Sequence, residues 1–179
     1  MIENEKQSRQ AAVLAVARDM MTAARTAPKG KGVDNLEIIT LSGDDLPRLA
    51  AEMRRYSERS GMKFFLRDAN NVEAANAVVV IGTRLGVFRL NCGYCGFPTC
   101  EAKTAAAPDA PCAFNTNDLG IAVGSAAAVA ADRRIDNRIM YSAARAALDL
   151  GLLGDCRAAF AILLSCTGKN PFFDRKSEK

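Results

Sequence analysis

The sequence contains no histidine among its 179 residues. Histidine is the commonest metal ligand of proteins and the usual general base near neutral pH. Its absence excludes imidazole from any site in this chain. A metal centre here must therefore use thiolates alone or add oxygen ligands.

The sequence also lacks a long apolar run and a block of one charge sign. Its longest apolar stretches, residues 77–82 and 158–164, have the length of a strand and fall far short of a membrane span. Three of the first six residues are charged, so no signal peptide is expected. A net charge of +4 without a Lys/Arg cluster does not call for nucleic acid. These absences predict a cytoplasmic protein that binds neither membrane nor nucleic acid.

Length and composition predict one domain spanning residues 1–179. The hydrophobic fraction of 49% and the charged fraction of 25% are ordinary for a globular protein, and the chain is long enough for a real core. The sequence has no internal repeat and no flexible linker. A cysteine-rich segment, residues 90–114, is expected to be an insertion within a single α/β body.

Four of the six cysteines are closely spaced in that segment. They follow the pattern C-x2-C-x4-C-x11-C, formed by Cys92, Cys95, Cys100 and Cys112. Without a secretion signal, clustered cysteines favour metal or redox chemistry over disulfides. The two others, Cys156 and Cys166, lie apart from the cluster and are expected to be small buried apolar residues.

Three readings of the four cysteines remain open. Zinc sites usually pair two separate two-cysteine knuckles, whereas three close thiols and one distant thiol are typical of iron–sulfur sites. Gly93 and Gly96 allow backbone amides to turn toward cluster sulfides, and the stiff residues Phe97 and Pro98 could shield a cluster from water. The alternatives are a structural zinc site and a glycine-rich loop with free or paired thiols.

The run from Cys92 to Cys100 resembles the C-G-x-C-G-x-x-x-C signature of four-cysteine [4Fe–4S] domains. Such domains occur in subunits of electron-transfer complexes and in corrinoid iron–sulfur proteins. In them a fourth cysteine follows a short helix, which is the place of Cys112 here. The resemblance implies that all four cysteines bind one [4Fe–4S] cluster.

A wider resemblance covers residues 23–175. This stretch is similar to a prokaryotic family of unknown function that is described as containing a ferredoxin domain. The segments that carry the resemblance are residues 112–115, 118–126, 136–142 and 167–175. The family implies no established activity. Asp118, Asp136 and Asn137 lie in these segments, but helix capping explains the two aspartates equally well, so no catalytic residue can be named.

Hydrophobic periodicity predicts alternating helices and strands. Helices are expected over residues 5–24, from the acidic turn at residues 42–45 through Met53, over residues 101–107, from caps at residues 115–118 to about residue 131, and over residues 138–150, ending at Gly151 or Gly154. Strands are expected over residues 36–41, 78–82 and 158–164, with a further strand at residues 86–90. Residues 64–66 fit a short strand or a link between a helix and a strand.

The order of these elements is similar to the nitroreductase fold, a central sheet flanked by helices in a three-layer α+β arrangement. The turn at residues 24–38, the acidic turn at residues 42–46 and the helix ending near Leu152 carry the resemblance. Nitroreductases are homodimers that bind FMN at the subunit interface, so the resemblance implies a homodimer, here formed through the alanine-rich helices. Cations for an FMN phosphate would come from Arg25, Lys29, Lys31, Lys169 and Arg175; a solvated basic turn and tail are the alternative.

We therefore expect an iron–sulfur protein for electron transfer or redox sensing, with a redox partner that the sequence does not identify. One alternative is a flavin-dependent oxidoreductase in which the cysteine segment is accessory. If both groups bind, the cluster would pass single electrons and the flavin would convert them to two-electron chemistry. The other alternative is a zinc-stapled binding module without redox chemistry.

Overall fold

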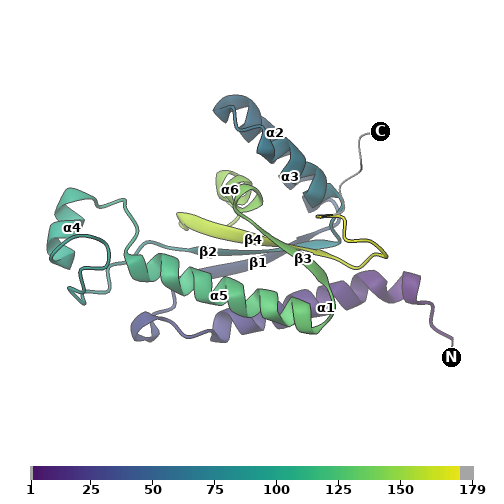
Figure 1. Ribbon diagram of the computed structural model, residues 1–179, viewed down its shortest axis with the longest axis horizontal. Coiled ribbons are helices and arrows are strands. Elements are labelled where there is room, and N and C mark those ends of the chain that lie inside the picture. Colours follow the sequence, from purple (N-terminus) through teal and green to yellow (C-terminus); the bar gives the residue numbers. More distant parts are fainter. Residues whose placement is uncertain (1, 174–179) are drawn as a thin grey trace.

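A four-stranded antiparallel sheet forms the middle layer of the computed structural model, which describes residues 2–173 (Figure 1). The strand order is β1-β2-β4-β3. The elements in chain order are α1 Glu5–Thr26, the 3-10 turn η1 Gly30–Gly32, β1 Leu36–Ser42, α2 Asp45–Ser60, α3 Phe64–Glu73, β2 Ala77–Thr83, α4 Cys100–Ala106, α5 Ala113–Asp132, β3 Asp136–Met140, α6 Tyr141–Asp149 and β4 Ala158–Ser165.

The two central strands are built from β-branched and aliphatic residues that are buried on both faces. Every residue of β2 is buried, and β4 is buried from Ala161 to Ser165. Because side chains alternate along a strand, Val78 and Val80 face one side and Val79 and Ile81 the other. The former pack against α2, α3 and α6, and the latter against α1 and α5. Two apolar cores thus lie on opposite faces of one sheet. Figure 1 shows α2, α3 and α6 on one side of the sheet and α1 and α5 on the other.

The ends of the sheet matter for the position of the cysteines. Leu36 of β1, Thr83 of β2 and Ala158 of β4 lie at one end, by the strand register. Ser42, Ala77 and Leu164 lie at the other end. The chain leaves the first end after Thr83 and forms α4 and its flanking loops. Residues 90–114, called the cysteine lobe below, extend beyond that end of the sheet (Figure 1).

Most predicted elements are present, and the three-layer α/β fold with a nitroreductase-like order is confirmed. The helix at residues 5–24 runs to Thr26, and the strands at residues 36–41, 78–82 and 158–164 each extend by one or two residues. Gly151 ends α6 with φ 70°. The amides of Gly151 and Leu152 there donate to the carbonyls of Leu148 and Ala147, which is a Schellman cap.

Four local predictions are wrong. Residues 64–66 begin helix α3, because Phe65 packs at helical spacing with Ala69 and Val72 in one core. Residues 86–90 form no strand, since Arg89 has φ 55° and no neighbouring strand pairs with them. The helix expected over residues 138–150 starts only at Tyr141, since Asp136–Met140 pairs with β4 as the edge strand β3.

The fourth wrong prediction concerns the start of α5. Cys112 is the N-cap residue of this helix, so Asn115 and Asp118 are buried residues inside the helix and not its N-cap. Among residues 2–173, no helix combines the length and apolarity that crossing a membrane requires.

Candidate metal centre

Left-handed backbone shapes the first half of the cysteine lobe. Asn91 has φ 49°, Gly93 φ 74° and Gly96 φ 84°. The Gly96 amide donates to the Gly93 carbonyl at 2.9 Å, which closes a tight turn between Cys92 and Cys95. A side chain at either glycine would adopt a strained conformation. The turn leaves Cys92 exposed and Cys95 partly exposed.

Asn91 fixes the third cysteine. Its side-chain oxygen Oδ1 accepts a hydrogen bond from the Cys100 amide at 2.8 Å, and its own amide donates to Cys100 Sγ at 3.4 Å. Thr99 Oγ1 accepts from the Ala102 amide at 3.1 Å and so caps α4. Cys100 therefore stands at the start of a helix, with its sulfur beside the residue that precedes Cys92.

Asn115 fixes the fourth cysteine. Its Oδ1 accepts hydrogen bonds from the Cys112 amide at 3.2 Å and from the Gly86 amide at 3.1 Å. Cys112 is buried, and Asn115 is only 1% exposed. The Nδ2 group of Asn115 has no hydrogen-bond partner among the described residues. A buried amide donor of this kind needs an acceptor.

Aromatic contacts join the two halves of the lobe to the body. The Tyr94 ring stacks on Phe114 with centroids 6.0 Å apart, and Phe88 lies 5.6 Å from the same ring. Asp118 accepts two hydrogen bonds of 3.0 Å from the Gly30 amide. The loop with Cys92 and Cys95 thus packs against the residue two positions after Cys112, and α5 is anchored to η1.

The four cysteines lie in one segment of the chain, yet their thiols are not gathered in one ligand set. Among residues 2–173, no group of three or more Cys, Asp or Glu side chains is arranged to hold a metal ion. Their assignment as ligands stays a prediction. No disulfide links them, since all six cysteines are free in the structure.

Two cavities of about 510 Å³ each flank the lobe. One is lined by Tyr94 and the first turn of α5, and the other by Arg89, Asn91, Cys100 and Glu101 together with Val87 and Thr104. The thiol of Cys100 therefore borders open space, which gives a ligand or a closing loop room beside it.

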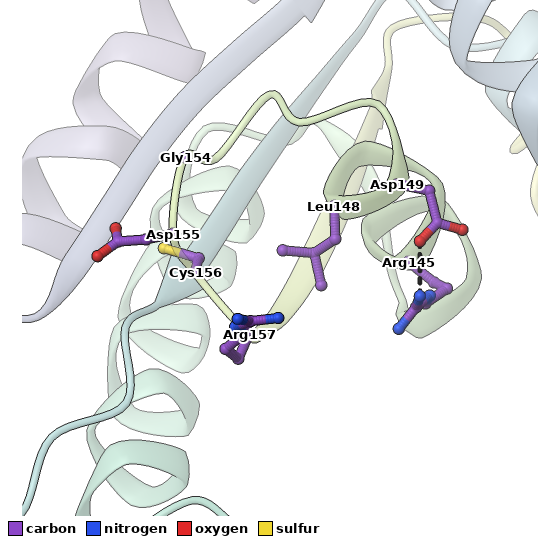
Figure 2. Close-up of a pocket in the computed structure, with 7 residues that line it drawn as sticks. All are labelled: Arg145, Leu148, Asp149, Gly154, Asp155, Cys156 and Arg157. Atoms are coloured by element: carbon purple, nitrogen blue, oxygen red, sulfur yellow. Dashed lines mark hydrogen bonds and ion pairs between the residues drawn. The ribbon is translucent and has the colours of Figure 1, made fainter. Parts of the chain in front are cut away.

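Cys156 and Cys166 lie on the sheet body. Cys156 is buried, and burial raises the pKa of its thiol. It lines a cavity of about 340 Å³ at the end of α6, together with Arg145, Leu148, Asp149, Gly154, Asp155 and Arg157 (Figure 2). Arg145 and Asp149 pair there at 2.6 Å, while Asp155 lies on the opposite side of the pocket. Cys166 follows β4 and is partly exposed. The expectation of full burial holds for Cys156 alone.

Of the predicted FMN cations, Arg25, Lys29 and Lys31 lie at the end of α1 and in the turn after it, and Lys169 lies apart from them. Arg25 donates to Asp34 at 2.6 Å and to the Leu36 carbonyl at 2.9 Å, and Lys29 donates to the Arg25 carbonyl at 2.5 Å. Lys31 donates to the Phe88 carbonyl at 3.2 Å and thereby contacts the base of the lobe. Lys169 follows β4 at the opposite end of the sheet, and Arg175 lies outside the described residues.

Sequence reasoning missed the structural roles of three residues in or directly after the lobe: Asn91, Lys103 and Asn115. Asn91 directly precedes the first cysteine, and an asparagine beside glycine-rich turns often adopts left-handed backbone and bonds locally. That signal was available. The burial of Lys103 had no signal in the sequence, because it depends on how the lobe folds over α4.

Comparisons with known proteins agree with this structure. A family model described as "Uncharacterized protein containing a ferredoxin domain" (DUF2148) matches residues 108–175, which include Cys112 but not the three earlier cysteines of the motif. A protein of Archaeoglobus fulgidus, itself described only as uncharacterized, is 41% identical over 191 aligned positions and covers 100% of both chains.

Solved structures of the nitroreductase fold are similar in shape. A nitroreductase with bound FMN from Bacteroides fragilis has a TM-score of 0.61 at 11% identity, with 92% of this chain and 83% of that chain covered. Nitroreductase CinD from Lactococcus lactis, in complex with nicotinic acid, has a TM-score of 0.60 at 13% identity, with 94% and 81% covered.

A BluB-like flavoprotein from Clostridium difficile 630 has a TM-score of 0.58 at 17% identity, with 92% of this chain and 84% of that chain covered. At such low identities these likenesses establish the fold alone. The sequence matches and the fold together establish that this chain belongs to the family of uncharacterized proteins containing a ferredoxin domain, built on a nitroreductase-like α/β/α sandwich.

Proposed function

We propose that this protein is an iron–sulfur redox protein whose cysteine lobe binds a [4Fe–4S] cluster through Cys92, Cys95, Cys100 and Cys112. One observation carries the proposal: the four cysteine segments are bonded into a single lobe at one end of the sheet. The Asn91–Cys100 bonds and the Tyr94–Phe114 stack connect them, and Asn115 links the Cys112 segment to the Gly86 amide. The ferredoxin-domain family supports an electron-transfer role.

The chemistry of the lobe fits the group. Four thiols and no imidazole are the donor set of iron–sulfur proteins. The unpaired Nδ2 of buried Asn115, beside Cys112, is the kind of donor that bonds to cluster sulfur. Because the thiols are not gathered, binding requires the Cys92–Cys95 turn to close toward Cys112. The exposed turn with its two glycines is suited to such a movement.

When bound, such a cluster supplies one-electron transfer. The residues of this chain would have three tasks. Asn91 orients Cys100, Asn115 orients Cys112, and the Phe88–Phe114–Tyr94 cluster limits the access of water. Six free cysteines suit a reduced compartment such as the cytoplasm.

Metal analysis after strictly anaerobic purification tests this function. We expect iron and acid-labile sulfide in equal amounts, with zinc far below the protein concentration. Stoichiometric zinc without iron would replace the proposal with a zinc-stapled binding module. Zinc found only after purification in air would not, because vacant thiolates bind zinc readily.

A flavin-dependent oxidoreductase is the second candidate, because a structural neighbour from Bacteroides fragilis holds FMN in the same fold. Lys31 is the best placed of the predicted cations, since it lines a cavity of about 180 Å³ with Val33, Asn35 and residues 86–89. Titration of the purified protein with FMN, followed by flavin fluorescence, tests this candidate. Absence of binding at micromolar FMN would discard it.

The protein is further proposed to be a homodimer that docks through α5. The exposed side of this helix carries Gly120, Ile121, Gly124 and Ala128, and no charged side chain is exposed between Thr116 and Ala131. Small residues permit close approach of a second helix, and the end of this face meets the cavity beside Tyr94.

A further inference from the structure

Lys103 is a buried lysine inside the cysteine lobe. It lies on α4 and is only 3% exposed. Its ammonium group Nζ donates to the Pro108 carbonyl at 3.3 Å. No carboxylate within the described residues lies in ion-pair distance of it; the nearest acids in sequence, Glu101 and Asp109, are both exposed. A buried ammonium without a counter-charge is costly, so such lysines are rare.

The position of Lys103 relates it to two of the predicted ligands. It follows Cys100 by three positions on α4, and residues at that spacing neighbour each other on one helix face. Its carbonyl partner, Pro108, belongs to the short segment that leads to Cys112. The ammonium therefore lies where α4 meets that segment, between the third and fourth cysteines along the chain.

A second buried donor, one residue after the lobe, also lacks a partner. Asn115 Nδ2, in the turn that holds Cys112, has no acceptor among the described residues. One buried cation without an anion and one buried donor without an acceptor therefore lie on either side of Cys112 in the chain. A negatively charged group in this region would give each of them the partner that it lacks.

We infer that Lys103 is the fixed positive charge that balances an anionic thiolate centre in the cysteine lobe. The inference rests on the proposed function, because that centre is the thiolate-bound metal. Four thiolates around a cluster, or around one divalent metal ion, leave a net negative charge. A buried ammonium stabilises this charge strongly because the low-dielectric interior screens it little. Reduction adds one more electron to the centre, so the same ammonium favours the reduced state and raises the midpoint potential.

Two variants separate the charge from the volume of this side chain. Lys103→Met keeps the length and removes the charge, and Lys103→Arg keeps the charge. Lys6→Met, an exposed lysine on α1, is the matched control. Zinc serves as the probe, since four thiolates around one zinc ion also form an anionic centre. Zinc affinity is measured on the apoprotein under anaerobic conditions by competition with a chelator.

The inference predicts opposite effects on the empty and the filled lobe. In Lys103→Met, we expect zinc affinity to fall at least tenfold and the midpoint potential of the reconstituted protein to fall. The denaturation midpoint of the apoprotein should stay unchanged or rise, because an uncompensated buried charge is gone. Lys103→Arg should keep a zinc affinity closer to wild type, and Lys6→Met should match wild type.

Several results would overturn the inference. A purely structural lysine would lower the stability of the apoprotein and leave zinc affinity in the folded variant unchanged. Equal zinc affinity in wild type and Lys103→Met would also show that Lys103 does not balance the charge of the centre. The proposed function fails separately: wild type that binds zinc but takes up no iron and sulfide refutes the iron–sulfur assignment, while the zinc difference still tests Lys103. Wild type that binds neither refutes both.

Discussion

Asn91 and Cys100 hold each other through two hydrogen bonds, one from the Cys100 amide to the Asn91 side chain and one from the Asn91 amide to Cys100 Sγ. The pair closes the loop that carries Cys92 and Cys95 onto the first turn of α4. This loop closure brings three of the four motif cysteines into one small region. It also makes a side chain outside the cysteine motif important for the centre.

Replacement of Asn91 by alanine should therefore weaken the centre without unfolding the protein. The variant loses the acceptor for the Cys100 amide, a bond worth about 1 kcal/mol, at an exposed position. We expect a several-fold faster loss of iron to a chelator, measured by absorption. Asn71→Ala on α3, outside the lobe, should lose iron at the wild-type rate. Equal rates in all three proteins would show that Asn91 has no role in the centre.

Cys112 should be the fourth ligand. Cys112→Ser replaces a soft thiolate with a weak hydroxyl ligand, so we expect iron content after anaerobic reconstitution to fall several-fold. Cys166→Ser, in the same assay, should retain the wild-type content. Undiminished iron in Cys112→Ser would mean that the fourth ligand lies elsewhere, with Cys156 and Cys166 as the remaining thiols.

The contact between Gly30 and the aromatic cluster should tolerate no side chain. A Cβ atom at Gly30 would lie 2.9 Å from Phe114 Cδ1 and 3.2 Å from Phe88 Cε1. Overpacking of this kind typically costs about 1–3 kcal/mol, so Gly30→Ala should lower the unfolding free energy by that amount in chemical denaturation. Gly168→Ala, where a Cβ meets no atom within 4 Å, should change it by less than about 0.5 kcal/mol. Similar values for both variants would contradict the packing described here.

Ion pairing of Glu52 should make the fold sensitive to acid. Burial opposes ionisation of Glu52, but hydrogen bonds from Arg59 and Arg55 outweigh it, so the pKa of this carboxyl lies below its ordinary value of 4.5. A lowered folded-state pKa stabilises the protein above about pH 4.5, and the contribution disappears as pH falls through the folded-state pKa. Glu52→Gln should thus lose about 1 kcal/mol at pH 7 and little at low pH.

Denaturant midpoints measured between about pH 3 and about pH 7 test this difference. Glu58→Gln, an exposed glutamate on the same helix, is the control and should follow the wild-type curve. A constant difference between Glu52→Gln and wild type over the whole pH range would contradict the assignment.

The exposed side of α5 should form the dimer interface. Ile121 is 37% exposed in the middle of this uncharged helix face. A charge there would be buried against the second copy at high cost, so Ile121→Glu should shift the protein from dimer to monomer in sedimentation velocity. Arg18→Glu on α1 serves as a control for charge alone. A dimeric Ile121→Glu variant would place the interface elsewhere. A monomeric wild type would show that the protein does not form the proposed dimer.

The sequence predicts the buried elements well, because their composition reflects burial directly. The run Val78–Ile81 is β-branched and buried on both faces, so it is recognisable without its neighbours. The edge strand β3 is different. Its sequence Asp-Asn-Arg-Ile-Met is mostly polar, and only pairing with β4 makes it a strand. Tertiary contact overrides local propensity there.

Of the candidate site, only the cysteine pattern was visible in the sequence. Cysteine spacing is visible in the sequence, whereas the partners of Asn91, Asn115 and Asp118 depend on contacts between distant segments. Asp118 illustrates this limit, because its bonds to Gly30 join residues 88 positions apart. In the proposed centre, the metal would draw the sulfur atoms together as much as the chain does.

X-ray absorption at the iron edge of the anaerobically purified protein tests the central claim most directly. The account predicts iron surrounded by about four sulfur atoms with a short iron–iron vector, and loss of this signal in a variant with Cys92, Cys95 and Cys100 replaced by serine. Iron with oxygen or nitrogen neighbours, or a signal unchanged by the three replacements, would contradict a cluster held by the cysteine lobe.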